Sequence, residues 1–344
     1  MKFTQMEKKQ LVIYGLVAFA VPYLLGVLMW YGYNHGIDVS VFPNAQMMYP
    51  AAGVMLAFLL TKGKDEWMPR RFFITFLVLT GLMIAMCIGS IFMPSPTVWL
   101  MAVQFGVIGA SILGWIMLLT EKREKRTAYG MRWKNWKKAL FCIGLFLLLY
   151  VLRTVIACAM SGQMEILGLI AGNPLTWISV ASLPINFFLV FIAFFGEEYG
   201  WRYFLQPMLQ KRFGLRWGVI IVGIVWGLWH MPVNLFYYSP GSGLESMAAQ
   251  QITCITLGIF FAYAYMKTQN IWVPVILHYL NNNLVPIISA NYSADVLQNQ
   301  QTTWGSLLPA LLLNGACFGL FLLAKEFRKK RKETAEYAKI DTNM

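Results

Sequence analysis

Two adjacent carboxylates and an arginine stand at the end of a strongly apolar stretch of this chain, as Glu197, Glu198 and Arg202. Placing an acidic side chain inside a membrane segment costs free energy unless another group pairs with it. Such residues are therefore candidates for a functional site. Two of the three histidines, His230 and His278, also lie in apolar segments. Carboxylates and imidazoles that are buried together favour hydrolytic or proton-transfer chemistry.

The spacing of the acidic motif suggests separate roles for its two carboxylates. Glu198 and Arg202 are four residues apart, so on a helix they share a face and can pair. Glu197 points about 100° away around the same helix and lacks that partner. We therefore expect Arg202 to fix and neutralise Glu198, which leaves Glu197 free to act as a general base or acid.

The second polar segment places glycines and a histidine on one helical face. Gly223, Gly227, His230 and Asn234 follow one another at intervals of four, three and four residues. Glycines on a helix face let a neighbouring helix approach closely. We therefore expect His230 to project into a tight seam between two helices.

The third polar segment contains His278 and Asn282, which are four residues apart and share a helical face. Pro274 lies one turn before His278, where it could kink the helix and free backbone groups.

These polar side chains are predicted to lie at a common depth in the membrane. From the basic residue that flanks each helix, Glu197 and His230 are each 14 residues away and His278 is 11 residues away. At about 1.5 Å per helical residue these separations correspond to roughly 21, 21 and 16 Å. The acid pair could instead lie at the membrane interface, and each histidine could serve only packing. Neither alternative requires the three side chains to lie at the same depth. The common depth favours one site built from three helices.

The elements that carry these residues are predicted to be transmembrane helices. The chain has 344 residues, of which 58% are hydrophobic and only 12% are charged. Repeated apolar runs of about 20 residues are typical of a polytopic helical membrane protein. We expect an all-α transmembrane bundle of about ten spans: 11–31, 45–61, 72–92, 98–120, 140–160, 177–206, 217–236, 250–266, 271–290 and 304–324.

The distribution of positive charge predicts the orientation of the bundle. The net charge is +13, yet 27 of the 28 Lys and Arg residues lie in alternate loops and at the two termini, which argues against a nucleic-acid partner. By the positive-inside rule both termini are cytoplasmic and the partner is the lipid bilayer. The remaining one, Arg153, lies within a span, and we expect it to pair with a loop acid or to extend toward the interface, outside the site. We expect an integral protein of a bacterial plasma membrane.

Three regions are expected along the chain. Residues 1–160 form transmembrane helices of unassigned role, and residues 177–290 form a catalytic membrane core. Residues 304–344 form the last helix and a basic cytoplasmic tail that fixes topology and contacts anionic lipid.

The three motifs together resemble those of the CPBP family, which contains the type II CAAX prenyl endopeptidases and their bacterial relatives, the Abi or bacteriocin-processing proteins. The resemblance covers about a third of the chain, residues 177–290. Each motif alone is weak, but all three in order on successive helices are specific. The matching residues are Glu197, Glu198 and Arg202, then Trp226 and His230, then His278 and Asn282. The family usually has Phe where this chain has Trp226.

This resemblance implies an intramembrane endopeptidase whose substrate is a peptide or a membrane protein. Peptide hydrolysis needs an activated water and a group that stabilises the oxyanion. Glu197 would activate water with help from His230, while His278 and Asn282 would donate to the oxyanion. The other motif residues would support the site, as Glu198, Arg202 and Trp226.

The cofactor is left open by the sequence. Glu197, His230 and His278 could bind a divalent metal such as zinc and keep one position open for water. The same residues also work without metal, and no HExxH motif is present to favour zinc. We favour the metal-free mechanism.

Two other functions fit part of the pattern. A transporter or channel could use the same carboxylates and histidines to relay protons or bind ions, although the sequence shows no inverted repeat. A non-enzymatic membrane scaffold or immunity protein could keep the fold, but the intact motifs argue against it.

Overall fold

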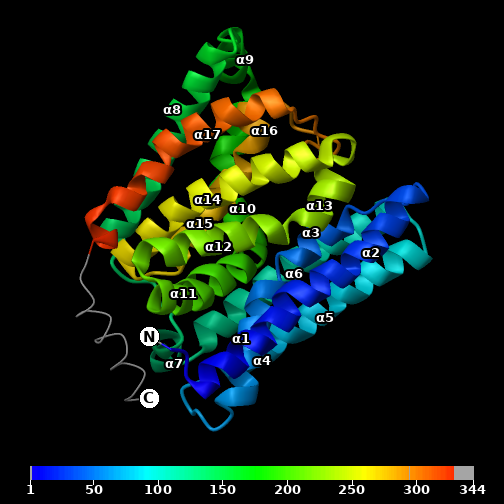
Figure 1. Cartoon of the computed structure of the whole chain (residues 1–344). Helices are drawn as coiled ribbons and strands as arrows, with labels where there is room; N and C mark the ends of the chain where they lie inside the picture. Colours follow the sequence, from blue (N-terminus) through cyan, green and yellow to red (C-terminus); the bar gives the residue numbers. More distant parts are fainter. Residues whose placement is uncertain (1, 294, 329–344) are drawn as a thin grey trace.

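The chain folds into a bundle of helices (Figure 1). The structure is a computed structural model that describes residues 2–293 and 295–328, so most of the predicted basic tail lies outside the described residues. Every regular element among those residues is a helix, which confirms the all-α prediction.

Six continuous helices of the described chain are long and apolar enough to cross a membrane. These spans show that the protein is an integral membrane protein. They are α1 to α2 (Gln5–Asn34), α5 (Arg70–Phe92), α6 (Pro96–Thr120), α8 (Trp136–Met160), α10 to α11 (Pro174–Phe213) and α14 with the short turn before it (Pro240–Thr268).

A seventh span is possible where α12 (Leu215–Trp229) continues, with a bend of 41°, into a helical segment that ends at Tyr238. The three remaining predicted ranges are helical but broken. They contain α3 (Val41–Gln46) and α4 (Tyr49–Thr61), then α15 (Trp272–Asn283) and α16 (Val285–Ile288), then α17 (Leu307–Cys317). The count of about ten spans stays a prediction.

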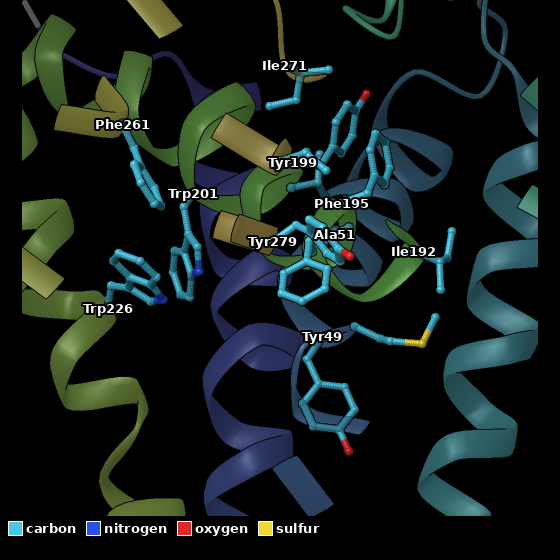
Figure 2. Close-up of a cluster of buried hydrophobic side chains, with 14 of the residues drawn as sticks. Tyr49, Ala51, Ile192, Phe195, Tyr199, Trp201, Trp226, Phe261, Ile271 and Tyr279 are labelled. Carbon is cyan, nitrogen blue, oxygen red and sulfur yellow. The ribbon is translucent and has the colours of Figure 1, made fainter. Parts of the chain in front are cut away.

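Helix α4 lies inside the bundle although it is short and contains Pro50. The proline stands in the first turn, where its missing N–H costs no helical bond. Residues 49–55 of α4 are all buried. Figure 2 shows Tyr49 and Ala51 close to Phe195 and Tyr199. This helix therefore supports the segment that carries the acidic motif.

The basic connections gather at one end of the bundle. Lys211 of α11 (Gln206–Phe213) forms an ion pair of 2.6 Å with Glu7 of α1 (Gln5–Gly15). Lys267 forms one of 3.2 Å with Glu326. In Figure 1 the N-terminus, α7 (Arg123–Ala128) and α11 lie toward the lower end, and α9 (Glu165–Gly172) lies at the opposite end. This segregation of charge agrees with the positive-inside pattern.

Arg153 does not behave as predicted. Among the described residues it forms no ion pair with a loop acid. Its Nη1 donates to Oδ1 of Asn314 in α17 at 3.2 Å, and its guanidinium lies 4.4 Å from the centre of the Tyr150 ring. An amide oxygen from α17 and an aromatic face from its own helix, α8 (Trp136–Met160), replace the expected carboxylate.

Candidate active site

The acidic motif lies where an α-helix changes into a π-helix. Glu197 and Glu198 are the last two residues of α10 (Pro174–Glu198), and a π-helical segment follows (Tyr199–Leu205). Such wider turns occur often at functional sites. A Cβ at Gly196 would lie 2.4 Å from the carbonyl oxygen of Met47, so only glycine lets this segment press against the turn before α4.

Glu198 forms the centre of a buried ionic cluster. Its Oε2 lies 3.2 Å from Nε of Arg202, as the spacing predicted, and its Oε1 lies 2.9 Å from Nδ1 of His278. The side chains of Glu198 and Arg202 are 0% and 1% exposed. The contact with His278 was not predicted. It joins α10 to α15 and fixes the orientation of the imidazole.

Glu197 is held by two tryptophans. The indole Nε1 of Trp226 donates to its Oε2 at 2.8 Å, and that of Trp201 donates to the same oxygen at 3.2 Å. As predicted, Arg202 pairs with Glu198 and not with Glu197. The two indole N–H groups are partners of Glu197 that were not predicted. The two bonds fix a carboxylate that is only 2% exposed while leaving Oε1 outside the indole pair.

His230 lies at the end of α12, where the helix bends. Its Nδ1 is 2.8 Å from the backbone oxygen of Trp226. Because a carbonyl oxygen can only accept, Nδ1 carries a hydrogen and a neutral ring keeps its lone pair on Nε2. Gly223 and Gly227 bring α14 (Gly243–Thr268) close, as predicted, and the sulfur of Cys254 in α14 lies 3.8 Å from Nδ1.

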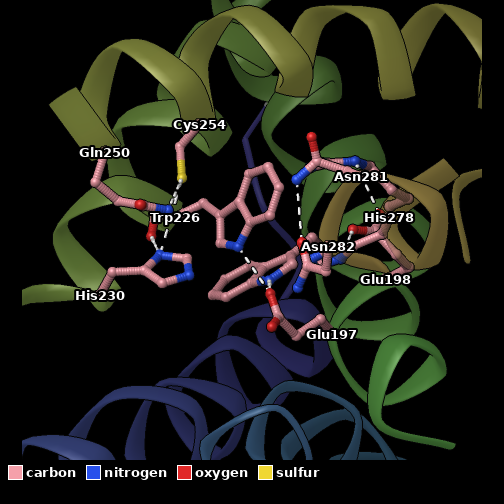
Figure 3. Close-up of polar contacts among 11 residues, drawn as sticks. Glu197, Glu198, Trp226, His230, Gln250, Cys254, His278, Asn281 and Asn282 are labelled. Atoms are coloured by element: carbon pink, nitrogen blue, oxygen red, sulfur yellow. Dashed lines mark hydrogen bonds and ion pairs between the residues drawn. The ribbon is translucent and has the colours of Figure 1, made fainter. Parts of the chain in front are cut away.

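Trp226 connects the predicted residues. The centre of its ring system lies 5.4 Å from that of His278 and 6.0 Å from that of His230, and the Arg202 guanidinium carbon lies 4.9 Å from it. Figure 3 shows Glu197, Glu198 and the two histidines around this indole. The structure thus brings the predicted residues of three helices together.

Asn282 lies one turn beyond His278 on α15. Its Oδ1 accepts a hydrogen bond of 3.0 Å from Nδ2 of Asn281, which leaves its own amide hydrogens available (Figure 3). The predicted kink at Pro274 is wrong. Helix α15 begins at Trp272, so the proline lies in the first turn, where helices accept it.

The site contains residues that the sequence reasoning missed. Trp201 lies four residues after Glu197 and therefore on the same helical face, but no role was predicted for it. Cys254 gave no local signal, because its contact with His230 depends on how α14 packs against α12.

The predicted metal ligands do not form a ligand set. Among residues 2–293 and 295–328, no group of three or more His, Cys, Asp or Glu side chains is arranged to hold a metal ion. Glu197, His230 and His278 are therefore not placed as a set of three zinc ligands.

Comparison with known proteins supports the resemblance. Residues 179–284 match the Rce1-like family of type II CAAX prenyl endopeptidases. A CAAX prenyl protease 2 from Methanococcus maripaludis is 31% identical over 110 residues, which cover 29% of this chain and 39% of that protein. The matched part is thus about two fifths of the relative's length. No solved structure matches the chain. The predicted resemblance to the CAAX protease family is confirmed.

Proposed function

Starting from a segment that matches the type II CAAX prenyl endopeptidases, we propose that this protein is an intramembrane endopeptidase that works by glutamate-activated water. One observation carries the proposal. Glu197 is a buried carboxylate whose Oε2 is fixed by two indole N–H groups, beside two histidines. A base that is held in this way is preorganised to take a proton without rearrangement.

The attacking water would lie between Glu197 and His230. Oε1 of Glu197 would accept a proton from the water as the oxygen attacks the substrate carbonyl. The lone pair on Nε2 of His230 would accept the second hydrogen of the water and orient it, because Nδ1 of that ring already donates to Trp226. The proton on Glu197 would then pass to the leaving amine.

His278 and Asn282 would stabilise the oxyanion. With a proton on both of its ring nitrogens, His278 donates through Nδ1 to Glu198 and can donate through Nε2 to the substrate. The two carboxylates are then balanced by one guanidinium and one imidazolium, so the buried cluster is neutral overall. The side-chain amide of Asn282 supplies a further donor.

The substrate is proposed to be a peptide or a membrane-associated protein. The relative from Methanococcus maripaludis is named for prenyl proteins. In a bacterial plasma membrane, a peptide pheromone or a bacteriocin precursor is the better candidate. The proposed orientation has about ten spans with both termini cytoplasmic, residues 177–290 as the catalytic core, and the site open to the cytoplasmic side.

Peptidomics of cells tests this function. Cells that carry the wild-type protein or Glu165→Gln, an exposed acid on α9, should release the same cleaved peptides. Cells that carry Glu197→Gln should lose them while the protein stays in the membrane at the same level. Unchanged peptides in the Glu197→Gln cells would remove the residue from catalysis. If proton uptake into vesicles instead depended on Glu197, the protein would be a transporter.

A further inference from the structure

Two prolines on different helices each leave a backbone oxygen without its usual helical partner. In an α-helix a carbonyl oxygen accepts from the N–H four residues later. For Ala18, in the π-helical turn Leu16–Ala20 that joins α1 to α2, that residue is Pro22. For Leu228, in the last turn of α12, it is Pro232. Proline has no N–H, so neither of these helical bonds can form. Oxygens freed in this way inside a membrane protein need other donors.

Each freed oxygen receives its donor from the other helix. Nε1 of Trp229 donates to the oxygen of Ala18 at 2.8 Å, and the hydroxyl of Tyr23 donates to the oxygen of Leu228 at 2.8 Å. Trp229 closes α12, and Tyr23 lies in α2 (Val21–Asn34). The two helices therefore exchange hydrogen bonds reciprocally, and we call these two bonds the proline brace.

The brace draws the helices into close contact. A Cβ at Gly26 of α2 would lie 2.9 Å from Cβ of Pro232, so the two proline-containing segments touch through a glycine. A third bond secures the same place, since Nε2 of Gln46 in α3 donates to the oxygen of Trp229 at 2.8 Å.

Trp229 transmits this contact to the site. It is 1% exposed, and its ring packs edge-on against His230 at 4.9 Å and against Trp201 at 5.5 Å. Trp201 is one of the two donors to Glu197. The position of one indole therefore bears on both groups that would hold the attacking water.

We infer that the N-terminal helix, which lies outside the matched residues 179–284, positions the catalytic centre through the proline brace. Trp229 and Tyr23 are positioning residues, because each acts through a hydrogen bond to the other helix. The inference rests on the proposed function for its catalytic meaning. It gives the N-terminal helices a role that the motifs do not contain.

Pro22→Ala is the direct test, because it returns an N–H to residue 22. The oxygen of Ala18 then also accepts from its own helix, so the Trp229 indole N–H must share this acceptor and is held less firmly. We expect kcat to fall about tenfold with KM unchanged, as for the loss of one hydrogen bond that orients the transition state. Thermal stability should not fall, because the substitution completes a helical bond. A merely structural role would move stability and activity together.

The matched controls are one proline and one tryptophan. Pro96→Ala changes the first residue of α6. An N–H at this position has no partner within the helix, so the substitution should leave kcat unchanged. Trp229→Phe should reproduce the loss of kcat, and the double variant with Pro22→Ala should lose no more than either alone. Trp217→Phe changes an exposed residue of the same helix and should behave as wild type.

Hydrogen exchange of the Trp229 indole N–H gives a readout that does not need activity. Its NMR signal is assigned as the one missing from Trp229→Phe. It should exchange slowly in the wild type and faster in Pro22→Ala. Unchanged exchange would overturn the brace, and faster exchange with unchanged kcat would overturn its positioning role. If the wild type cleaved no peptide, the proposed function would fail, while the exchange result would still decide whether the brace exists.

Discussion

Trp226 stands where the resemblance led us to expect phenylalanine, and the tryptophan has a direct consequence in the site. A phenylalanine there would keep the aromatic packing against His278 but could not donate to Glu197. The indole supplies the shorter of the two bonds to that carboxylate, at 2.8 Å. The departure therefore changes how the proposed base is held.

Trp226→Phe should lower kcat about tenfold without abolishing hydrolysis, because Trp201 still donates to Glu197. The acidic limb of the pH–rate profile should move to higher pH, since the ionised carboxylate loses a donor. Measurement of kcat across pH checks this. Trp115→Phe, which changes an indole that donates to a backbone oxygen elsewhere, is the control. An unshifted profile would show that the indole does not tune Glu197.

Substitution of Glu198 is expected to lower the stability of the protein, whereas substitution of Glu197 is not. Glu198→Ala leaves Arg202 buried without its carboxylate and removes the partner of His278. Breaking a buried ion pair by removing one partner costs about 3–5 kcal/mol. Thermal unfolding in detergent should therefore show a clear loss of stability for this variant, but little change for Glu197→Gln. Equal unfolding temperatures for Glu198→Ala and wild type would contradict the structural role.

At the scale of elements, the seam between α12 and α14 is set by glycine. A Cβ at Gly223 would lie 2.7 Å from the Cα of Ile255, which is backbone and cannot move aside cheaply. At Gly258, on the other side of the seam, the nearest atoms would be 3.7 and 3.9 Å away, at ordinary contact distance. The two positions therefore form a matched pair.

Gly223→Ala should push α12 away from α14 and destabilise the protein by about 1–3 kcal/mol, as overpacking does in other cores. Since α12 carries Trp226 and ends at Trp229, next to His230, hydrolysis should fall as well. Gly258→Ala should be nearly neutral in both unfolding and rate assays. If both variants behaved alike, the close approach at Gly223 would not control the site.

The sequence could predict local pairings better than contacts between helices. Glu198 and Arg202 are one turn apart, and the structure confirms their ion pair. The contact of Glu198 with His278 spans 80 residues, and it depends on how α10 and α15 rotate against each other. The spacing of residues along the sequence does not determine that rotation. The same reason explains why the indole bond from Trp226 to Glu197 was not foreseen.

For the whole molecule, the apolar pattern correctly predicted a helical membrane fold. The number of spans was more difficult to predict from the sequence. Helix-length rules assume straight, continuous spans. Here the chain bends at Pro232 and breaks before Pro50 and Pro286. The π-helix after Glu198 carries the sixth predicted span on to Phe213, beyond its predicted end at residue 206.

The bundle also packs the N-terminal helices, which contain none of the motifs, against the segment that contains all of them. The matched residues 179–284 contain the acidic, histidine and asparagine groups, yet α1 to α4 pack directly against them. Tyr14 of α1 contacts the ring of Trp201 edge-on, at 6.2 Å between ring centres. Helices α1 to α4 thus pack around the site.

The role of Glu197 as the base can be measured with purified protein in lipid vesicles that cleaves a peptide in ¹⁸O-labelled water. The wild type should place the label in the new terminal carboxylate. Glu197→Gln, with an unchanged unfolding temperature, should do so about a hundredfold to ten-thousandfold more slowly. Cleavage by Glu197→Gln at the wild-type rate would show that Glu197 does not activate the water.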